Sequence, residues 1–158
     1  MVIISDSSPI SNLIKIGELH LLQQVFETIV IPRIVYEEFC IIDCQKSMLE
    51  QLDWITVIEL KDSSLKNTLL LELDKGEAEA IALAIELNAD FLLIDEKTGR
   101  AVAERLGLKI TGIIGILIQA KQKGFIYQVK PYLERLINEA SFRISPNLFK
   151  NVISLLNE

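Results

Sequence analysis

The segment from Gly76 to Arg100, GEAEAIALAIELNADFLLIDEKTGR, most constrains what this chain can fold into. Its apolar residues first recur with helical spacing and then form an unbroken run, Phe91-Leu92-Leu93-Ile94, that ends on Asp95. A short apolar run without alternation is typical of a parallel strand covered on both faces. The segment therefore predicts a helix, a short buried strand and the start of a second helix, as in α/β proteins.

The acids of the first helix differ in their predicted surroundings. At about 100° per residue, Glu77 falls within about 80° of the apolar residues of this helix. Glu79 and Glu86 lie on the opposite, solvated side. A charge on an apolar face is costly unless it is paired or bound to a cation, so Glu77 is a candidate site residue. Its place in the first helical turn, after the break at Asp74-Lys75-Gly76, also fits a purely structural role.

Two aspartates follow apolar strands directly. Asp95 ends the run at 91–94, and Asp6 follows the strand predicted at 2–5. Ligands bind at the carboxyl ends of strands in open parallel sheets, so both are candidate site residues. Alternatively, either aspartate has no site role and serves only as the N-cap of the helix that follows it. For the first helix, the sequence predicts Ser8 as the N-cap and Pro9 at the first helical position.

A fourth acid comes from the helix that Pro32 is predicted to open in its first turn. On the helical wheel Glu38 falls on the apolar side, between Ile34 and Ile42, whereas Glu37 falls toward an edge. Glu38 is therefore the candidate site residue of this pair. In the alternative interpretation, Glu38 has no site role and its side chain extends past the core.

Five short apolar strands alternate with helices along the chain, at about 2–5, 28–31, 54–60, 91–94 and 108–110. This alternation predicts the α/β class, with a central parallel sheet of about five short strands in a three-layer α/β/α fold and one domain over residues 1–158. Right-handed crossovers bring the carboxyl ends of the strands to one edge. Asp6 and Asp95 meet there, and Glu38 and Glu77 can complete a four-acid cluster.

Such a cluster indicates metal chemistry. Four carboxylates cannot share a small pocket in ionised form without a cation, since like charges raise one another's pKa. Hard oxygen ligands without His or Cys select Mg²⁺ or Mn²⁺. Phosphodiester hydrolysis is the reaction class that fits such a site best.

Composition narrows the function further. The net charge of −6 argues against a broad DNA-coating role, although a bound metal reverses the local sign at an acidic site. Cys40 and Cys44 have a helical spacing and the chain has one His, so the usual zinc site is excluded. We expect both thiols to be reduced and buried or half-buried. The sequence shows no signal peptide and no apolar run that could span a bilayer. These features predict a cytoplasmic protein. We expect the apolar run 112–120 to belong to the core.

The order and spacing of several motifs resemble those of PIN domains, in the group related to VapC-type toxins of toxin–antitoxin pairs. The resemblance covers nearly the whole chain. Its marks are Ser5-Asp6-Ser7-Ser8-Pro9-Ile10, Ile31-Pro32, Val35-Tyr36-Glu37-Glu38-Phe39, the segment 76–84, Leu93-Ile94-Asp95-Glu96-Lys97, and Thr111-Gly112-Ile113-Ile114-Gly115.

The resemblance implies a metal-dependent ribonuclease that holds Mg²⁺ or Mn²⁺ with Asp6, Glu38, Glu77 and Asp95. It also implies an RNA substrate, a small antitoxin partner and a homodimer. Glu96 is the one nearby candidate for a further family acid, and Ser7 is a candidate to orient a metal-bound water. Lys97 and Arg100 could meet RNA phosphates or, with Arg105, form an ordinary solvated helix face.

Other readings stay open. One is a catalytically weak PIN-like module that binds an antitoxin or RNA. A phosphatase of the haloacid dehalogenase type needs a second Asp two residues after the first, where this chain has Ser8. A receiver domain needs an acidic pair before the first helix, and Asp6 has no such neighbour.

Overall fold

The computed structural model of the chain describes residues 1–41 and 43–158, with the side chains of all of these except 43–45. Its strands are β1 (Ile3–Ser5), β2 (Ile29–Pro32), β3 (Ile55–Ile58), β4 (Phe91–Leu93) and β5 (Ile110–Thr111). Its helices are α1 (Ser7–Lys15), α2 (His20–Phe26), α3 (Arg33–Cys40), α4 (Asp43–Glu50), α5 (Ser64–Leu69), α6 (Lys75–Glu86), α7 (Lys97–Arg105), α8 (Ile113–Gln122), α9 (Lys130–Glu139) and α10 (Pro146–Leu155). The five strands form one parallel sheet, as predicted, and their order in it is β3-β2-β1-β4-β5.

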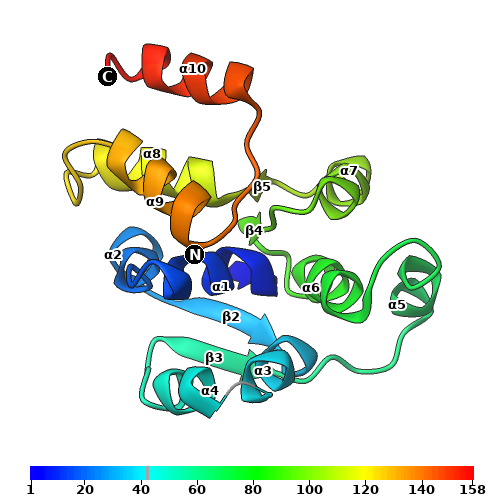
Figure 1. Ribbon diagram of the computed structural model, residues 1–158. Coiled ribbons are helices and arrows are strands. Elements are labelled where there is room, and N and C mark those ends of the chain that lie inside the picture. The colour runs from blue at the N-terminus through cyan, green and yellow to red at the C-terminus, as the bar shows by residue number, and fades with distance from the viewer. Residues whose placement is uncertain (42) are drawn as a thin grey trace.

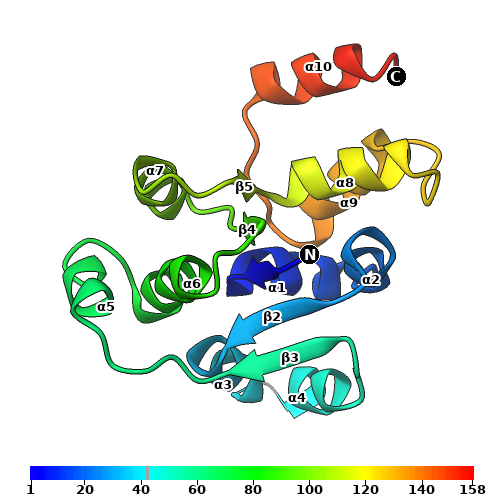
Figure 2. The ribbon, with the colours of Figure 1, turned by 180° about the vertical axis from the view of Figure 1, so that it is seen from behind.

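Helices cover both faces of this sheet, which confirms the three-layer α/β/α prediction (Figures 1 and 2). Successive strand residues point to opposite faces. Ile3 and Leu93 lie in a core shared with α1, α2, α8 and α9. Their neighbours Ile4 and Leu92 lie in a second core shared with α6 and α7. Burial on both sides explains why these strands are apolar without alternation.

The strand order reverses at β1, which has β2 on one side and β4 on the other. The Asp6 N–H donates to the Leu93 carbonyl (N···O 3.0 Å), and the Ile94 N–H donates to the Thr111 carbonyl (3.0 Å). These bonds continue the ladder past the strand ends and hold the backbone at Asp6 beside the end of β4. Ligands bind at such a reversal of strand order in open α/β sheets.

Two helices begin at other residues than the sequence predicts. Helix α1 starts at Ser7 with Asp6 as its N-cap residue, so the prediction of Ser8 as the cap is wrong. Asp6 is in extended conformation and its side chain makes no capping hydrogen bond. Pro32 ends β2, opposite Ile58, and precedes α3 instead of lying in its first turn. Its ψ of 151° continues the strand, because pairing with β3 extends to this residue.

Glu79 departs from the helical-wheel prediction. Its carboxylate lies 2.8 Å from Lys66 Nζ, and its side chain is only 12% exposed. Helix α5 packs against α6 on this side, so the predicted solvated position is wrong for Glu79, while Glu86 is exposed as predicted. The wheel describes one helix alone and contains nothing about the neighbour that covers it.

The remaining sequence predictions concern apolar and thiol side chains. Ile113 and Leu117 of the run 112–120 are fully buried, which confirms its core role. None of the described helices is long and apolar enough to cross a membrane. Cys40 is half-buried and its thiol is free, whereas the side chain of Cys44 lies outside the described residues.

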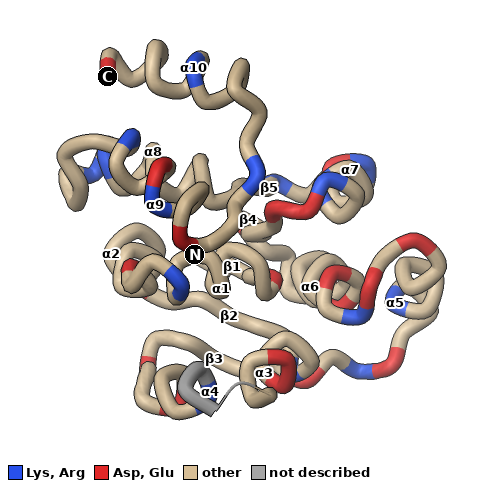
Figure 3. The backbone as a smooth tube through the Cα atoms, viewed as in Figure 1, with Lys and Arg blue, Asp and Glu red and all other residues tan. Residues whose placement is uncertain are grey.

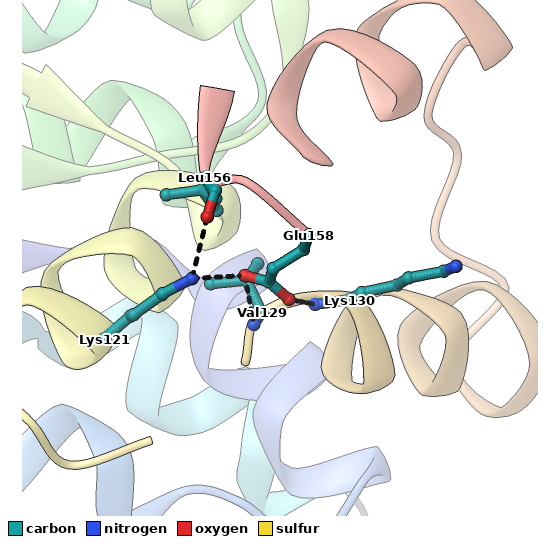
Figure 4. A network of polar contacts seen from close by, with 5 residues as sticks. All are labelled: Lys121, Val129, Lys130, Leu156 and Glu158. Atoms are coloured by element: carbon teal, nitrogen blue, oxygen red, sulfur yellow. Dashed lines mark hydrogen bonds and ion pairs between the residues drawn. The ribbon is translucent and has the colours of Figure 1, made fainter. Parts of the chain in front are cut away.

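Helix α10 is joined to α9 by an extended segment that passes beside β5 (Figure 1). The chain after α10 is tied back to the body by Glu158, whose side chain is 3% exposed (Figure 4). Glu158 accepts hydrogen bonds from Lys121 Nζ (2.8 Å), Val129 N–H (2.9 Å) and Lys130 N–H (3.0 Å). Lys121 Nζ also donates to the Leu156 carbonyl (3.1 Å), so one cluster joins the chain end to α8 and α9.

Candidate metal centre

Three carboxylates converge on the first turn of α6. A Cβ placed on Gly76 would lie 2.8 Å from Glu38 Oε1, 3.4 Å from Asp6 Oδ1 and 3.5 Å from Asp74 Oδ1. Asp6 is 2% exposed at the end of β1, whereas Glu38 reaches in from the exposed side of α3. Gly76 therefore leaves the space that these side chains occupy. Figure 3 shows acidic positions on both α3 and α6.

Glu77 has two roles in this turn. Its N–H donates to Asp74 Oδ1 (2.8 Å), and its Oε2 accepts a weaker bond from the Asp74 N–H (3.4 Å), which completes a capping box. Its side chain is nevertheless buried, with the residue 7% exposed, as the helical wheel predicts. Its Oε1 lies 3.4 Å from the Cβ position of Gly99 in α7. The capping role and the site position therefore coexist.

Burial and mutual repulsion raise the pKa of three of the four predicted acids, Asp6, Glu38 and Glu77. The pKa of Asp6 is raised to about 7, chiefly by burial; the Ser7 N–H lowers this pKa, and the charges of Glu77, Asp74 and Glu38 raise it. Burial likewise raises the pKa of Glu38, with Asp74 acting in the same direction and the Ser7 hydroxyl in the opposite one. For Glu77, burial and then the charge of Asp74 raise the pKa. These acids form an electrostatically coupled cluster.

Asp95 has different partners. Its Oδ1 accepts a hydrogen bond from the Ile113 N–H (2.9 Å), and Arg100 Nη1 donates to the adjacent Ile94 carbonyl (3.0 Å). Burial raises the Asp95 pKa, while the Ile113 N–H and the Arg100 charge lower it. Its Oδ2 is buried and has no hydrogen-bond partner among the described residues. This oxygen is available to a ligand.

Thus the structure brings Asp6, Glu38 and Glu77 together and places Asp95 at the neighbouring strand end. The charge of Glu96 raises the pKa of both Glu77 and Asp95. Within the described residues, no three His, Cys, Asp or Glu side chains are arranged so that they could hold a metal ion. Binding of one ion by all four predicted acids therefore requires side-chain rearrangement.

The donor set fits Mg²⁺ or Mn²⁺. All the converging side chains offer carboxylate oxygens, which these hard cations prefer. The unpartnered Asp95 Oδ2 adds an available carboxylate donor at the neighbouring strand end. Sequence reasoning missed Asp74 as a member of this cluster. The signal was the Asp-x-x-Glu spacing from Asp74 to Glu77, which is a capping-box pattern.

Comparison with known families agrees with this architecture. A family model described as a PIN domain matches residues 2–158, nearly the whole chain. A comparison with curated proteins gives no match. PIN domains are generally nucleases, which act on nucleic acids and typically use divalent metals. The parallel five-stranded sheet and the match over almost its full length show that the chain belongs to the PIN-domain family.

Proposed function

We propose that the protein is a Mg²⁺- or Mn²⁺-dependent endoribonuclease, with residues 1–158 acting as one PIN domain. The observation that carries this proposal is the convergence of the Asp6, Glu38 and Asp74 carboxylates around Gly76, with Glu77 close enough to raise the pKa of Asp6. They lie at the reversal of strand order, where Asp95 follows β4. Repulsion among these acids favours a cation, and their oxygens are the ligands that such a cation prefers.

Asp6, Glu38, Glu77 and Asp95 would hold the ion. When bound, it would polarise a phosphate oxygen, lower the pKa of a water and stabilise the leaving oxygen. Asp6 is the most firmly positioned of the four, because it is buried and its N–H is bonded to the Leu93 carbonyl. Glu38 is the most exposed of them and would close the site toward solvent.

Glycines leave room for these acids at three points. A Cβ on Gly76 would meet Glu38, one on Gly99 would meet Glu77, and one on Gly112 would overlap Asp95 Oδ1. Arg100 donates a hydrogen bond to the Ile94 carbonyl. Its positive charge lies near Asp95 and lowers the pKa of that carboxyl. We assign these residues a positioning role, with the four acids as the ligands.

The resemblance to VapC-type toxins supports a more specific proposal. We propose that the protein is the toxin of a toxin–antitoxin pair, that it forms a homodimer and that a small antitoxin binds it. We also propose that it acts in the cytoplasm, a reducing compartment with which the free thiol of Cys40 is consistent.

One observation favours the alternative of a catalytically weak module that binds RNA or an antitoxin. Asp95 is engaged by the Ile113 N–H, and no three-ligand arrangement is preformed among the described residues. The side-chain rearrangement needed for metal binding has a free-energy cost that would weaken metal affinity.

Metal titration calorimetry with Mn²⁺ and Mg²⁺, combined with an RNA-cleavage assay, separates the two functions. Asp6→Asn is the test variant and Glu79→Gln is the matched control, because Glu79 lies in α6 and pairs with Lys66 away from the cluster. The ribonuclease proposal expects metal binding and metal-dependent cleavage in wild type and control, and neither in Asp6→Asn. Metal binding without cleavage of any RNA supports the weak module. No metal binding in wild type refutes the proposed centre.

A further inference from the structure

A cavity of about 880 Å³ lies beside Asp95, outside the acidic cluster. Its walls are one face of α1, the start of α7 and the segment that joins α9 to α10. Serine and asparagine side chains of α1 line much of it: Ser7, Ser8, Ser11 and Asn12. Hydroxyl and amide groups of this kind bond to phosphate and sugar oxygens in protein–nucleic acid complexes.

Three cations line this cavity, together with the two acids Asp95 and Glu96. Lys15, Lys97 and Arg143 line it, and none of the three forms an ion pair with any described residue. Other cations do pair, such as Arg105 with Glu72. Figure 3 shows basic positions on α7 and on the segment between α9 and α10. Unpaired cations around one cavity provide a site for a polyanion.

A second cavity, of about 420 Å³, shares Asp95, Phe142 and Arg143 with the first. The segment that carries Phe142 and Arg143 therefore borders both cavities. The backbone of Ser141 has a left-handed conformation (φ 54°). The Phe142 N–H donates to the Leu136 carbonyl (3.0 Å), which fixes this segment to α9. Asp95, which lines both cavities, lies two residues after the end of β4.

We propose that the two adjoining cavities form the binding path of a single-stranded phosphodiester chain, which places its scissile phosphate at Asp95. Lys15, Lys97 and Arg143 bind phosphates, and Phe142, half-buried in both walls, stacks on an unpaired base. A duplex keeps its bases stacked inside and offers none to Phe142. This inference rests on the proposed ribonuclease function and names its substrate class and binding residues.

The test is fluorescence anisotropy of a labelled single-stranded RNA with the full chain in EDTA, where metal-dependent cleavage cannot occur. Lys15→Gln, Lys97→Gln and Arg143→Gln are each expected to weaken binding about three- to tenfold. Each should also reduce the slope of log K against log salt by about 0.7. Phe142→Leu should weaken binding and leave the slope unchanged.

Lys61→Gln is the matched control, because it removes the same charge next to β3, at the sheet edge opposite β5. It should bind RNA as the wild type does. If the three test variants bind as Lys61→Gln does, or if duplex RNA of the same sequence binds as tightly as the single strand, the proposed path is wrong. Binding of single-stranded DNA of the same sequence shows which groups of the nucleic acid are contacted. DNA affinity equal to that of RNA supports contacts to phosphates and bases alone. Weaker DNA binding supports additional contacts to the 2′-hydroxyl.

Failure of this path differs from failure of the ribonuclease proposal. Metal-dependent cleavage that the three cation variants leave unchanged overturns the path and retains the ribonuclease. RNA binding that depends on the three cations, without cleavage in Mg²⁺ or Mn²⁺, supports the path and overturns the ribonuclease.

Discussion

Glu38 Oε1 lies 2.8 Å from the point that a Cβ on Gly76 would occupy, so the two residues compete for one space. We predict that Gly76→Ala retains the fold, because alanine favours a helix by about 1 kcal/mol and the exposed Glu38 side chain can move away. The displaced carboxylate should lower Mn²⁺ affinity and RNA cleavage by at least about tenfold. Calorimetric titration and urea unfolding of the same samples measure both effects.

A double-mutant cycle checks the cause of this loss. If Gly76→Ala acts through Glu38, adding it to Glu38→Gln should cause little further loss of metal affinity. Full additivity of the two losses would contradict the steric argument.

The raised pKa of Asp6 predicts how stability depends on pH. Its ordinary pKa of 3.8 is raised to about 7, so the folded chain holds this proton more tightly than the unfolded chain. The free energy of unfolding in EDTA should therefore fall as pH rises from about 4 to about 7, by up to roughly 4 kcal/mol from this group. Urea unfolding at several pH values measures the trend. A free energy of unfolding that rises over this range would contradict it.

Asp6→Asn should flatten this dependence. The variant should be more stable than wild type at about pH 8 in EDTA, because it removes a buried charge from a repelling cluster. The pKa values of Glu38, Glu77 and Asp95 are raised as well, so some pH dependence should remain. At saturating Mg²⁺ the order should reverse, since only the wild type gains stability from the ion. Thermal unfolding with and without Mg²⁺ compares the two proteins.

Glu77 and Glu79 lie in one helix and should respond differently to removal of their charge. Glu77→Gln should abolish metal-dependent cleavage. Glu79→Gln should retain cleavage and lower the free energy of unfolding by about 1 kcal/mol, because it weakens the 2.8 Å pair with Lys66. Cleavage assays and urea unfolding on both variants make the comparison. Equal losses of activity would show that the assignment of Glu77 to the site is wrong.

Glu158 holds the end of the described chain to α8 and α9 (Figure 4). Glu158→Ala should leave the Val129 N–H and Lys121 without this acceptor and destabilise the packing of α10 by about 1–3 kcal/mol. Hydrogen exchange should then be faster in α10 and unchanged in β1 and β4. Lys150→Ala, in an exposed part of α10, is the control. Unchanged exchange in α10 would show that the cluster does not hold this helix.

Much of the candidate site could be proposed from the sequence because its signals are local. An apolar strand followed by an aspartate made Asp6 and Asp95 candidates, and helical periodicity placed Glu77 on a buried face, where the structure also has it. The same periodicity failed for Glu79, which faces Lys66 of α5. The role of Asp74 beside Asp6 was also missed, although its spacing to Glu77 was visible.

By itself, the sequence determined the α/β class, the parallel character of the strands and the acids at the strand ends. These follow from polarity and periodicity within single segments. Only the tertiary structure decided that Glu38 reaches Gly76, that Asp95 binds the Ile113 N–H and that Arg143 borders a cavity with Lys15. Such contacts join segments that are distant in the chain. They depend on how both cores pack against the sheet, which no pattern within one segment specifies.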